Sequence, residues 1–334
     1  MGIKGTIRAI NAANRAAERE AKRRQRELEK AKNHFDKMAT IEQAHFEVDE
    51  FENFIDRIIT IHSHEPAKLD WNEIKFRKRP AEPKFSNANE EKTLNVINNY
   101  NPSVFDKLFK REAKKRKELE SYLEKARIKD KKHHKIRLKN YDKALEDWKS
   151  EKHLAERVTN KEIESFAEVL DQLNPFEEIS ELGSEVAFKF QESQPLIVKV
   201  NVHSDDLVPK QKKSILKSGK LSLKNMPKGE FYEIYQDYVC GVVLRIANEI
   251  FSLLPLQGLV INAVDNLLNT STGHIEEQII LSVGIPRSTL ESLNLKFIDP
   301  SDSLENFVHN MSFKKTQGFE VVDEINWENL NLGL

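Results

Sequence analysis

Residues 231–254 constrain the fold more strongly than any other part of the chain, because their apolar side chains would cover almost the whole circumference of a helix. Such a helix is normally buried, since each large apolar side chain removed from water contributes roughly 1.5–3 kcal/mol. A membrane span needs about 20 residues largely free of charge, and this segment carries four charged residues. We therefore predict a buried central helix of a folded domain. Its narrow polar stripe consists of Asp237, Arg245, Asn248 and Glu249.

Arg245 and Glu249 are four residues apart, so they would lie one helical turn from each other. A buried charge needs a partner, and we predict that these two side chains form a buried polar pair. The alternative is a polar pocket beside the helix. Cys240 lies in the same segment, and a buried thiol without an activating neighbour is unreactive. As the single cysteine of the chain, it excludes an intrachain disulfide and indicates a reducing, cytoplasmic compartment.

The distribution of charge divides the chain into two halves. Residues 1–158 contain 38 Lys or Arg and 28 Asp or Glu, for a net charge of +10, whereas residues 159–334 contain 15 and 26, for a net charge of −11. We predict two domains with these boundaries, a basic helical one and an acidic α+β one. Either the basic domain binds an anionic partner or the two halves neutralise each other.

The first domain is rich in helix-forming residues from its start to about residue 62, and again from about 102 to 157. A connector with several prolines, residues 64–102, separates the two helices and contains one short predicted helix near residues 90–99. Apolar residues in the first helix follow alternating steps of three and four, which is typical of a coiled coil, with one phase shift. We predict an antiparallel helical hairpin, or alternatively an intermolecular coil. The apolar positions are Leu28, Ala31, Phe35 and Met38, then Ile41, Ala44, Val48, Phe51, Ile55 and Ile58.

The second domain opens with a predicted capping box, in which Thr159 and Glu162 would cap a helix reaching to about residue 173. Strand patterns follow at 185–190, 196–203, 259–264 and 278–285, and the last two are expected to form a hairpin. Two more helix starts are predicted near Ser288 and at Asp299, with Pro300 in the first helical position. The last helix would bury Leu304, Phe307, Val308 and Met311, and Trp327 would anchor the acidic C-terminal segment. The fold class is therefore α+β, with a long basic helical hairpin or coiled coil before a smaller domain built around the central helix.

Sequence motifs for catalysis, cofactors or metals are incomplete. The run KSGKL at 217–221 lacks the first glycine and the Ser or Thr of a phosphate-binding loop. The histidine pairs at 62 and 64 and at 133 and 134 are expected to be exposed, and neither has a second ligand pair at zinc spacing. The nuclease-like [DE]xK triplets at 73–75, 90–92 and 112–114 lie outside the predicted sheet. A carboxylate site at His203, Asp205 and Asp206 remains an alternative. We expect no metal and no cofactor, and no small-molecule ligand is identifiable.

The basic helices are the remaining functional signal. Phosphate backbones attract such helices without regard to nucleic-acid sequence, although a solvated coil face has the same composition. We predict an intracellular, non-enzymatic assembly or adaptor protein that binds itself or another protein through its coil, without integral membrane contact. The alternative is a nucleic-acid-binding effector or nuclease-like enzyme, for instance of a defence system, that grips phosphates with the basic coil. Its candidate contacts are Lys110, Arg111, Lys114, Lys115, Arg116 and Lys117.

Overall fold

The computed structural model describes residues 3–101, 112–190, 195–202 and 207–330. It is 56% helical and 19% strand, which confirms the predicted mixture of helices and sheet. The chain forms two compact units: unit 1 comprises residues 1–67 and 172–334, and unit 2 comprises residues 68–171. These boundaries differ from the predicted division after residue 158, because the first long helix belongs to the unit that contains the sheet.

Unit 1 begins with α1 (Ile3–Ile59), followed by the single turn η1 (Ile61–Ser63). The phase shift in the apolar pattern divides this helix into two parts. After the shift, the pattern packs against α9, β3 and β4, and Ala44, Val48 and Ile58 are buried. Before the shift, every described side chain between residues 22 and 40 is exposed. Hence only the second apolar seam of α1 has a packing partner among the described residues of unit 1.

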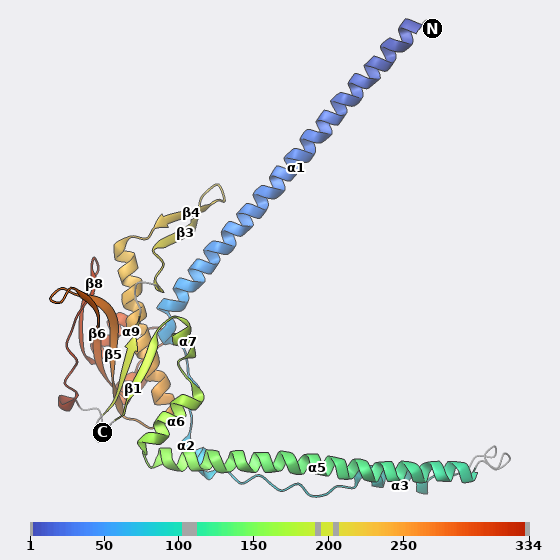
Figure 1. Ribbon diagram of the computed structural model, residues 1–334, viewed down its shortest axis with the longest axis vertical. Helices are drawn as coiled ribbons and strands as arrows, with labels where there is room; N and C mark the ends of the chain where they lie inside the picture. The colour runs from blue at the N-terminus through green and yellow to red at the C-terminus, as the bar shows by residue number, and fades with distance from the viewer. Residues whose placement is uncertain (1–2, 102–111, 191–194, 203–206, 331–334) are drawn as a thin grey trace. The chain divides into compact units, whose positions relative to one another are not determined.

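The main sheet has the order β1-β2-β5-β6-β7-β8 (Figure 1). β2 and β5 are parallel, and the other neighbours are antiparallel. The strand pair β5–β6 confirms the predicted hairpin. The strands are β1 (Glu185–Lys189), β2 (Leu196–Asn201), β5 (Gly258–Asn269), β6 (His274–Pro286), β7 (Val308–Lys314) and β8 (Gly318–Glu320).

Helix α9 (Lys228–Leu253) lies between β4 and β5 in the chain and corresponds to the predicted helix at 231–254. Its buried residues include Tyr238, Val242, Leu244 and Ile250, none of which exposes any measurable surface. Trp327, in the turn η3 (Trp327–Asn329), packs against a small apolar cluster of Val260 and Ile325, as expected of an anchor for the C-terminal segment.

The predicted last helix is wrong beyond its first turn. Asp299 caps α11 (Pro300–Ser303) with Pro300 in the first turn, as expected, and the turn η2 (Leu304–Asn306) ends the helical stretch. Residues 308–314 then form β7 beside β6, and Val308, which was expected to be buried, is 59% exposed. The physical reason is the vacant edge of β6: ladder hydrogen bonds to that edge outweigh a weak local helical preference.

A two-stranded sheet, β3 (Gln211–Ile215) and β4 (Leu221–Asn225), lies beside α1. Its turn contains the lysine and glycine run that resembles a phosphate-binding loop. The Gly219 N–H donates to the Leu216 carbonyl at 2.8 Å, and Gly219 has a φ of +79°. A Cβ at this position would lie 2.9 Å from Ile41 of α1, so the glycine allows the turn to approach the helix closely. The run therefore serves as a hairpin turn.

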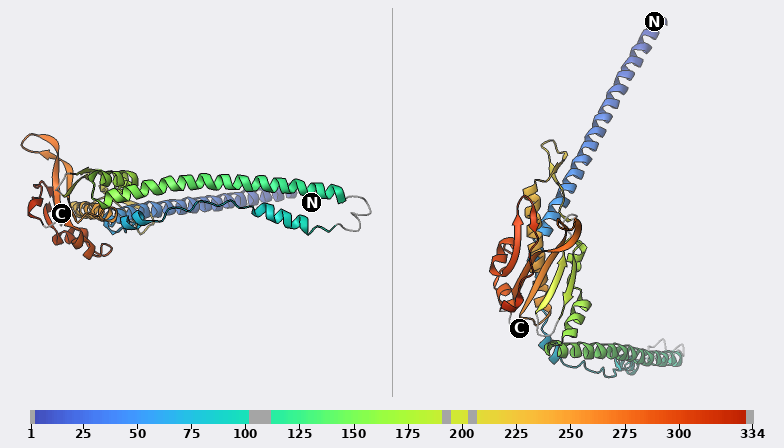
Figure 2. Two further views of the ribbon diagram at one scale, coloured as in Figure 1. Left: turned by 90° about the horizontal axis from the view of Figure 1, so that it is seen from below. Right: turned by 60° about the vertical axis from the view of Figure 1, so that its left-hand side comes forward.

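In unit 2, the short helices α2 (Trp71–Phe76) and α3 (Ala88–Asn98) lie along the long helix α5 (Glu112–Thr159) (Figure 2). The connector between them is held by side chains: the Trp148 indole donates to the Arg77 carbonyl at 2.9 Å, and Arg79 donates to the Tyr141 hydroxyl at 3.1 Å. The buried Asp130 carboxylate accepts the backbone N–H groups of the first turn of α3. The predicted hairpin of the two long helices therefore describes neither unit, since α5 packs with α2 and α3.

The predicted capping box is also wrong. Thr159 is the last residue of α5, and its hydroxyl donates to the Glu156 carbonyl at 2.9 Å instead of capping a new helix. The Glu162 carboxylate accepts from Arg157 at 3.3 Å, and the chain turns at Lys161, which has a φ of 61°. The next helices are α6 (Ile163–Leu173) and α7 (Glu177–Glu181). Thr159 and Glu162 match the sequence motif of a capping box, but α5 continues through Thr159, so this residue cannot begin a new helix.

Candidate functional site

The exposed part of α1 carries apolar side chains on a helix that is otherwise polar. Leu28 is 72% exposed and Met38 is 54% exposed, and both belong to the seam before the phase shift. Charged residues surround them, and Arg23 pairs with Glu27 at 3.5 Å on the helix surface. The helix has 57 residues, which corresponds to a length of about 85 Å. This surface has the spacing of a helix–helix contact.

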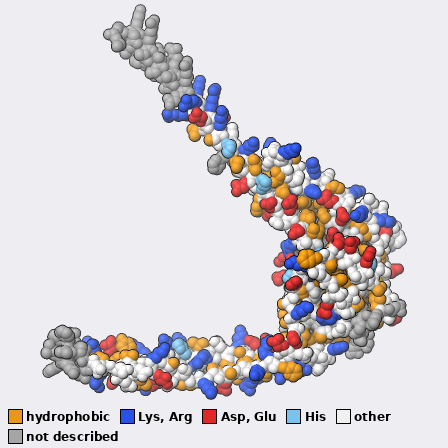
Figure 3. Space-filling view, turned by 180° about the vertical axis from the view of Figure 1, so that it is seen from behind, with side chains coloured by type: hydrophobic (Ala, Val, Ile, Leu, Met, Phe, Trp, Pro, Cys, Tyr) orange, Lys and Arg blue, Asp and Glu red, His pale blue; other side chains and the backbone are white. Residues whose placement is uncertain are grey.

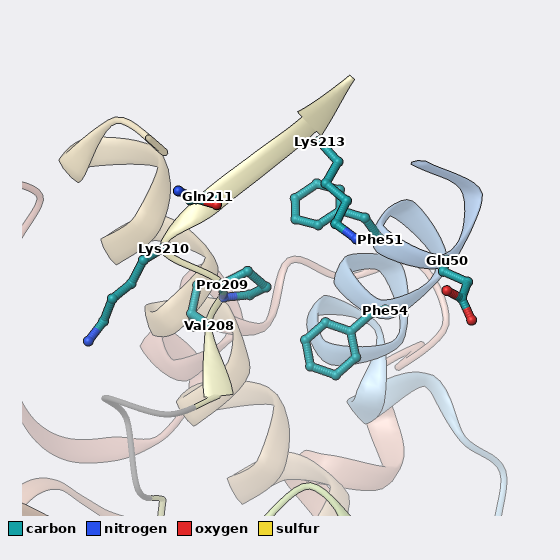
Figure 4. Close-up of a pocket in the computed structure, with 8 residues that line it drawn as sticks. All are labelled: Glu50, Phe51, Phe54, Val208, Pro209, Lys210, Gln211 and Lys213. Atoms are coloured by element: carbon teal, nitrogen blue, oxygen red, sulfur yellow. The ribbon is translucent and has the colours of Figure 1, made fainter. Parts of the chain in front are cut away.

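A groove lies where α1 meets the segment 208–213 (Figure 4). Phe51 and Phe54 extend from α1 toward Val208 and Pro209, and the cavity has a volume of about 670 Å³. Charged residues mark its rim, where Lys213 pairs with Glu47 at 3.3 Å. Its apolar side chains suit an aliphatic or aromatic side chain, and its lining contains no Ser, Thr or Cys.

The predicted phosphate contacts are only partly described. Lys110 and Arg111 lie outside the described residues, whereas Lys114, Lys115, Arg116 and Lys117 are exposed in the first turns of α5. Thirteen Lys or Arg and five Asp or Glu lie between residues 113 and 143. Counted by structural unit, unit 2 has 27 Lys or Arg and 20 Asp or Glu, for a net charge of +7, and unit 1 has a net charge of −8.

Acidic side chains interrupt this basic surface. Figure 3 shows Lys and Arg interleaved with Asp and Glu along the helical unit. Arg127 pairs with Glu90 of α3 at 2.8 Å, and hydrogen bonding to that carboxylate raises the pKa of the guanidinium. Arg77 pairs with Glu151 at 2.7 Å. Part of the positive charge of unit 2 therefore holds the connector against α5.

Arg245 and Glu249 lie together on α9, where the Arg245 Nε donates to the Glu249 Oε1 at 2.8 Å. The two residues are only 4% and 6% exposed. The same guanidinium donates to the Ile61 carbonyl at 3.4 Å and lies 3.5 Å from the Glu178 carboxylate. Asn248 donates to the His64 carbonyl at 3.2 Å. The polar stripe of α9 thus fixes the turn that ends α1.

His62 corrects the expectation that the histidine at this position is exposed. It is 4% exposed, and its Nε2 lies 3.3 Å from the Ile298 carbonyl. Burial lowers its pKa, which favours the neutral imidazole. The position opposite is Gly241, where an added Cβ would lie 3.0 Å from Ile61 and 3.5 Å from the His62 Nδ1. The sequence offered one signal for this contact, a glycine within an apolar helix.

Asp237 lies on the same helix near the capping residue Asp299. Burial raises the pKa of Asp237 to about 6, and the Asp299 carboxylate adds to the effect, while a hydrogen bond from Ser301 opposes it. For Asp299, burial alone would raise the pKa. Hydrogen bonds from the Asp302 N–H and from Ser301 outweigh burial, so the pKa is lowered. These carboxyl groups therefore have structural roles at the start of α11.

Groups suited to nucleophilic or metal chemistry are not brought together within the described ranges. Cys240 is fully buried, and burial raises the pKa of its thiol. His133 is exposed, and His134 is half-buried with its ring 5.3 Å from that of Phe85. No cluster of three or more potential metal ligands occurs among the described residues. The alternative site at His203, Asp205 and Asp206 lies outside them.

None of the described helices has the length and apolar character needed to cross a membrane. Comparisons with models of protein families, with characterised proteins and with solved structures found no match to this chain.

Proposed function

We propose that this chain is an intracellular, non-enzymatic assembly or adaptor protein that self-associates through the N-terminal part of α1 and presents the α+β part of unit 1, which contains the sheet. The observation that carries the proposal is the division of α1 at its phase shift. The seam after the shift is packed within the chain, whereas Leu28 and Met38 of the seam before it are exposed. The single buried Cys240 supports a reducing compartment.

A long helix in water obtains most of its stability from the packing of an apolar face. Residues 22–40 have no such packing among the described residues. A two-stranded coiled coil with a second copy would bury both apolar side chains, and the interleaved charges would remain in water. In this proposal, α9 is the central helix of unit 1, and its packing against the second seam of α1 holds that helix in place.

The first prediction is that the intact protein is a dimer or larger at tens of micromolar and that Leu28→Glu with Met38→Glu abolishes the association through α1, so that the mass in solution falls. Two carboxylates facing each other across the seam would oppose association. Light scattering coupled to size-exclusion chromatography measures the change. Asn33→Glu with Thr40→Glu adds the same charge at exposed positions off the seam and is expected to leave the dimer intact. A monomeric parent protein would refute the role of α1.

A second candidate function is the binding of a polyanion by unit 2, which is favoured by its net charge of +7. The corresponding prediction is that duplex DNA or RNA binds the intact chain with an affinity that falls steeply between low and physiological salt. Reversing the charges of Lys114, Lys115, Arg116 and Lys117 should weaken binding equally for every nucleic-acid sequence, since phosphate contacts carry no base information. Fluorescence anisotropy at several salt concentrations measures this. Absence of salt-sensitive binding would eliminate this candidate and leave the assembly role.

A further inference from the structure

Strand β1 occupies one end of the main sheet, and its only strand neighbour among the described residues is β2 (Figure 1). The other edge of an end strand presents backbone N–H and C=O groups that can accept another strand. The five residues Glu185–Lys189 form this edge. Val186 and Phe188 are half-buried, and the Phe188 ring lies 5.4 Å from that of Phe176. The opposite row, Glu185, Ala187 and Lys189, is exposed.

The sequence of β1, EVAFK, is complementary to itself in charge. If a second copy pairs antiparallel about a two-fold axis through Ala187, Glu185 of one copy lies opposite Lys189 of the other, and the reverse pair forms on the other side. Opposite charges in directly opposed positions stabilise a strand pair. Parallel pairing would instead place Glu185 opposite Glu185 and Lys189 opposite Lys189, which is unfavourable. Only the antiparallel arrangement satisfies both charges.

We propose that β1 pairs with β1 of a second copy of this chain, so that the two six-stranded sheets become continuous. Such an interface uses the same surface of both copies, as a two-fold contact requires. Charged residues on an edge strand commonly prevent pairing between sheets. Here the two-fold symmetry places Glu185 of each copy opposite Lys189 of the other, so the same charges attract. Extended strands without this charge pattern would lack these pairs, which favours a second copy of this chain as the partner. This surface is separate from the exposed seam of α1, and the inference therefore goes beyond the proposed function.

A disulfide tests the predicted geometry. In the two-fold pair, the Ala187 Cβ atoms lie about 4.5–5.5 Å apart, and the near end of this range is within reach of a disulfide, so Ala187→Cys should give a disulfide-linked dimer under mild oxidation. The native cysteine, Cys240, is buried and will not interfere. Lys199→Cys is the matched control, because Lys199 is exposed and directly opposite Ala187 on β2. The two introduced cysteines at position 199, one in each copy, would be three strand spacings apart, roughly 14 Å, which is beyond disulfide reach.

Charge reversal tests the specificity. Glu185→Lys or Lys189→Glu, each added to Ala187→Cys, should reduce the yield of cross-linked homodimer about tenfold, since each reversal creates two repulsive pairs. A mixture of the two reversed chains should restore cross-linking as a mixed dimer, and so should one chain that carries both reversals. The inference is overturned if Ala187→Cys gives no disulfide-linked dimer although its thiol is accessible, or if the yield of cross-linked dimer is the same with and without the charge reversals. Because Leu28 and Met38 are unchanged in these variants, failure here is distinct from failure of the α1 contact.

Discussion

Replacing Leu244 with aspartate is expected to unfold the unit that contains the sheet. Leu244 exposes no surface and lies in the part of α9 that is buried on all sides. Removing a buried leucine side chain costs about 2–5 kcal/mol, and an unpaired buried carboxylate adds several more. The sum is comparable to the whole stability of an ordinary domain, about 5–15 kcal/mol. Circular dichroism should show loss of the cooperative thermal transition, and the protein should elute as an aggregate.

Leu268→Asp is the control for this experiment, because it makes the same substitution on β5 at a residue that is 62% exposed. We expect its melting temperature to stay within a few degrees of the parent value, since surface substitutions usually change stability little. A soluble Leu244→Asp protein with the melting temperature of the parent would show that α9 does not support the core.

The second large effect is expected at the buried polar pair. Arg245→Met leaves the Glu249 carboxylate buried without its main partner and should cost about 3–5 kcal/mol. The double variant Arg245→Met, Glu249→Leu removes both charges and should recover most of that loss, because apolar residues of similar volume often replace a buried pair without penalty. Urea unfolding of the parent, the two single variants and the double variant measures the coupling between the two positions.

Arg23→Met is the matched control, since Arg23 also has a glutamate partner four residues later but is 75% exposed. Exposed pairs of this kind contribute little to stability, and we expect no resolvable shift in the urea midpoint. If Arg245→Met unfolded at the same urea concentration as Arg23→Met, the pair on α9 would have no stabilising role.

Features that depend on local pattern could be predicted from the sequence, and features that depend on tertiary neighbours could not. The apolar run that became α9, the hairpin β5–β6 and the Asp299 cap followed from residues adjacent in sequence. The capping box at Thr159 failed because α5 continued through it. Residues 308–314 became a strand because β6 had a vacant edge, which no local signal could reveal.

The same distinction applies to the candidate surfaces. The apolar spacing of α1 could be read from the sequence, but which of its two seams is packed within the chain depends on β3, β4 and α9. The burial of His62 depends on Gly241, nearly 180 residues away in the sequence. The charge symmetry of EVAFK is visible in the sequence, but it has meaning only once β1 is known to end the sheet.

The phase shift in α1 has a consequence for how two associated copies would be oriented. Each residue of an α-helix turns the next by about 100°, so the number of residues between the two seams sets the direction in which the attached sheet points around the coiled-coil axis. Inserting one residue between Met38 and Ile41 would rotate the sheet of unit 1 by about 100° around that axis, whereas inserting seven would return it to within about 20° of its original direction. The three-residue step from Met38 to Ile41 thus fixes the direction, around the coiled-coil axis, in which each copy displays its sheet.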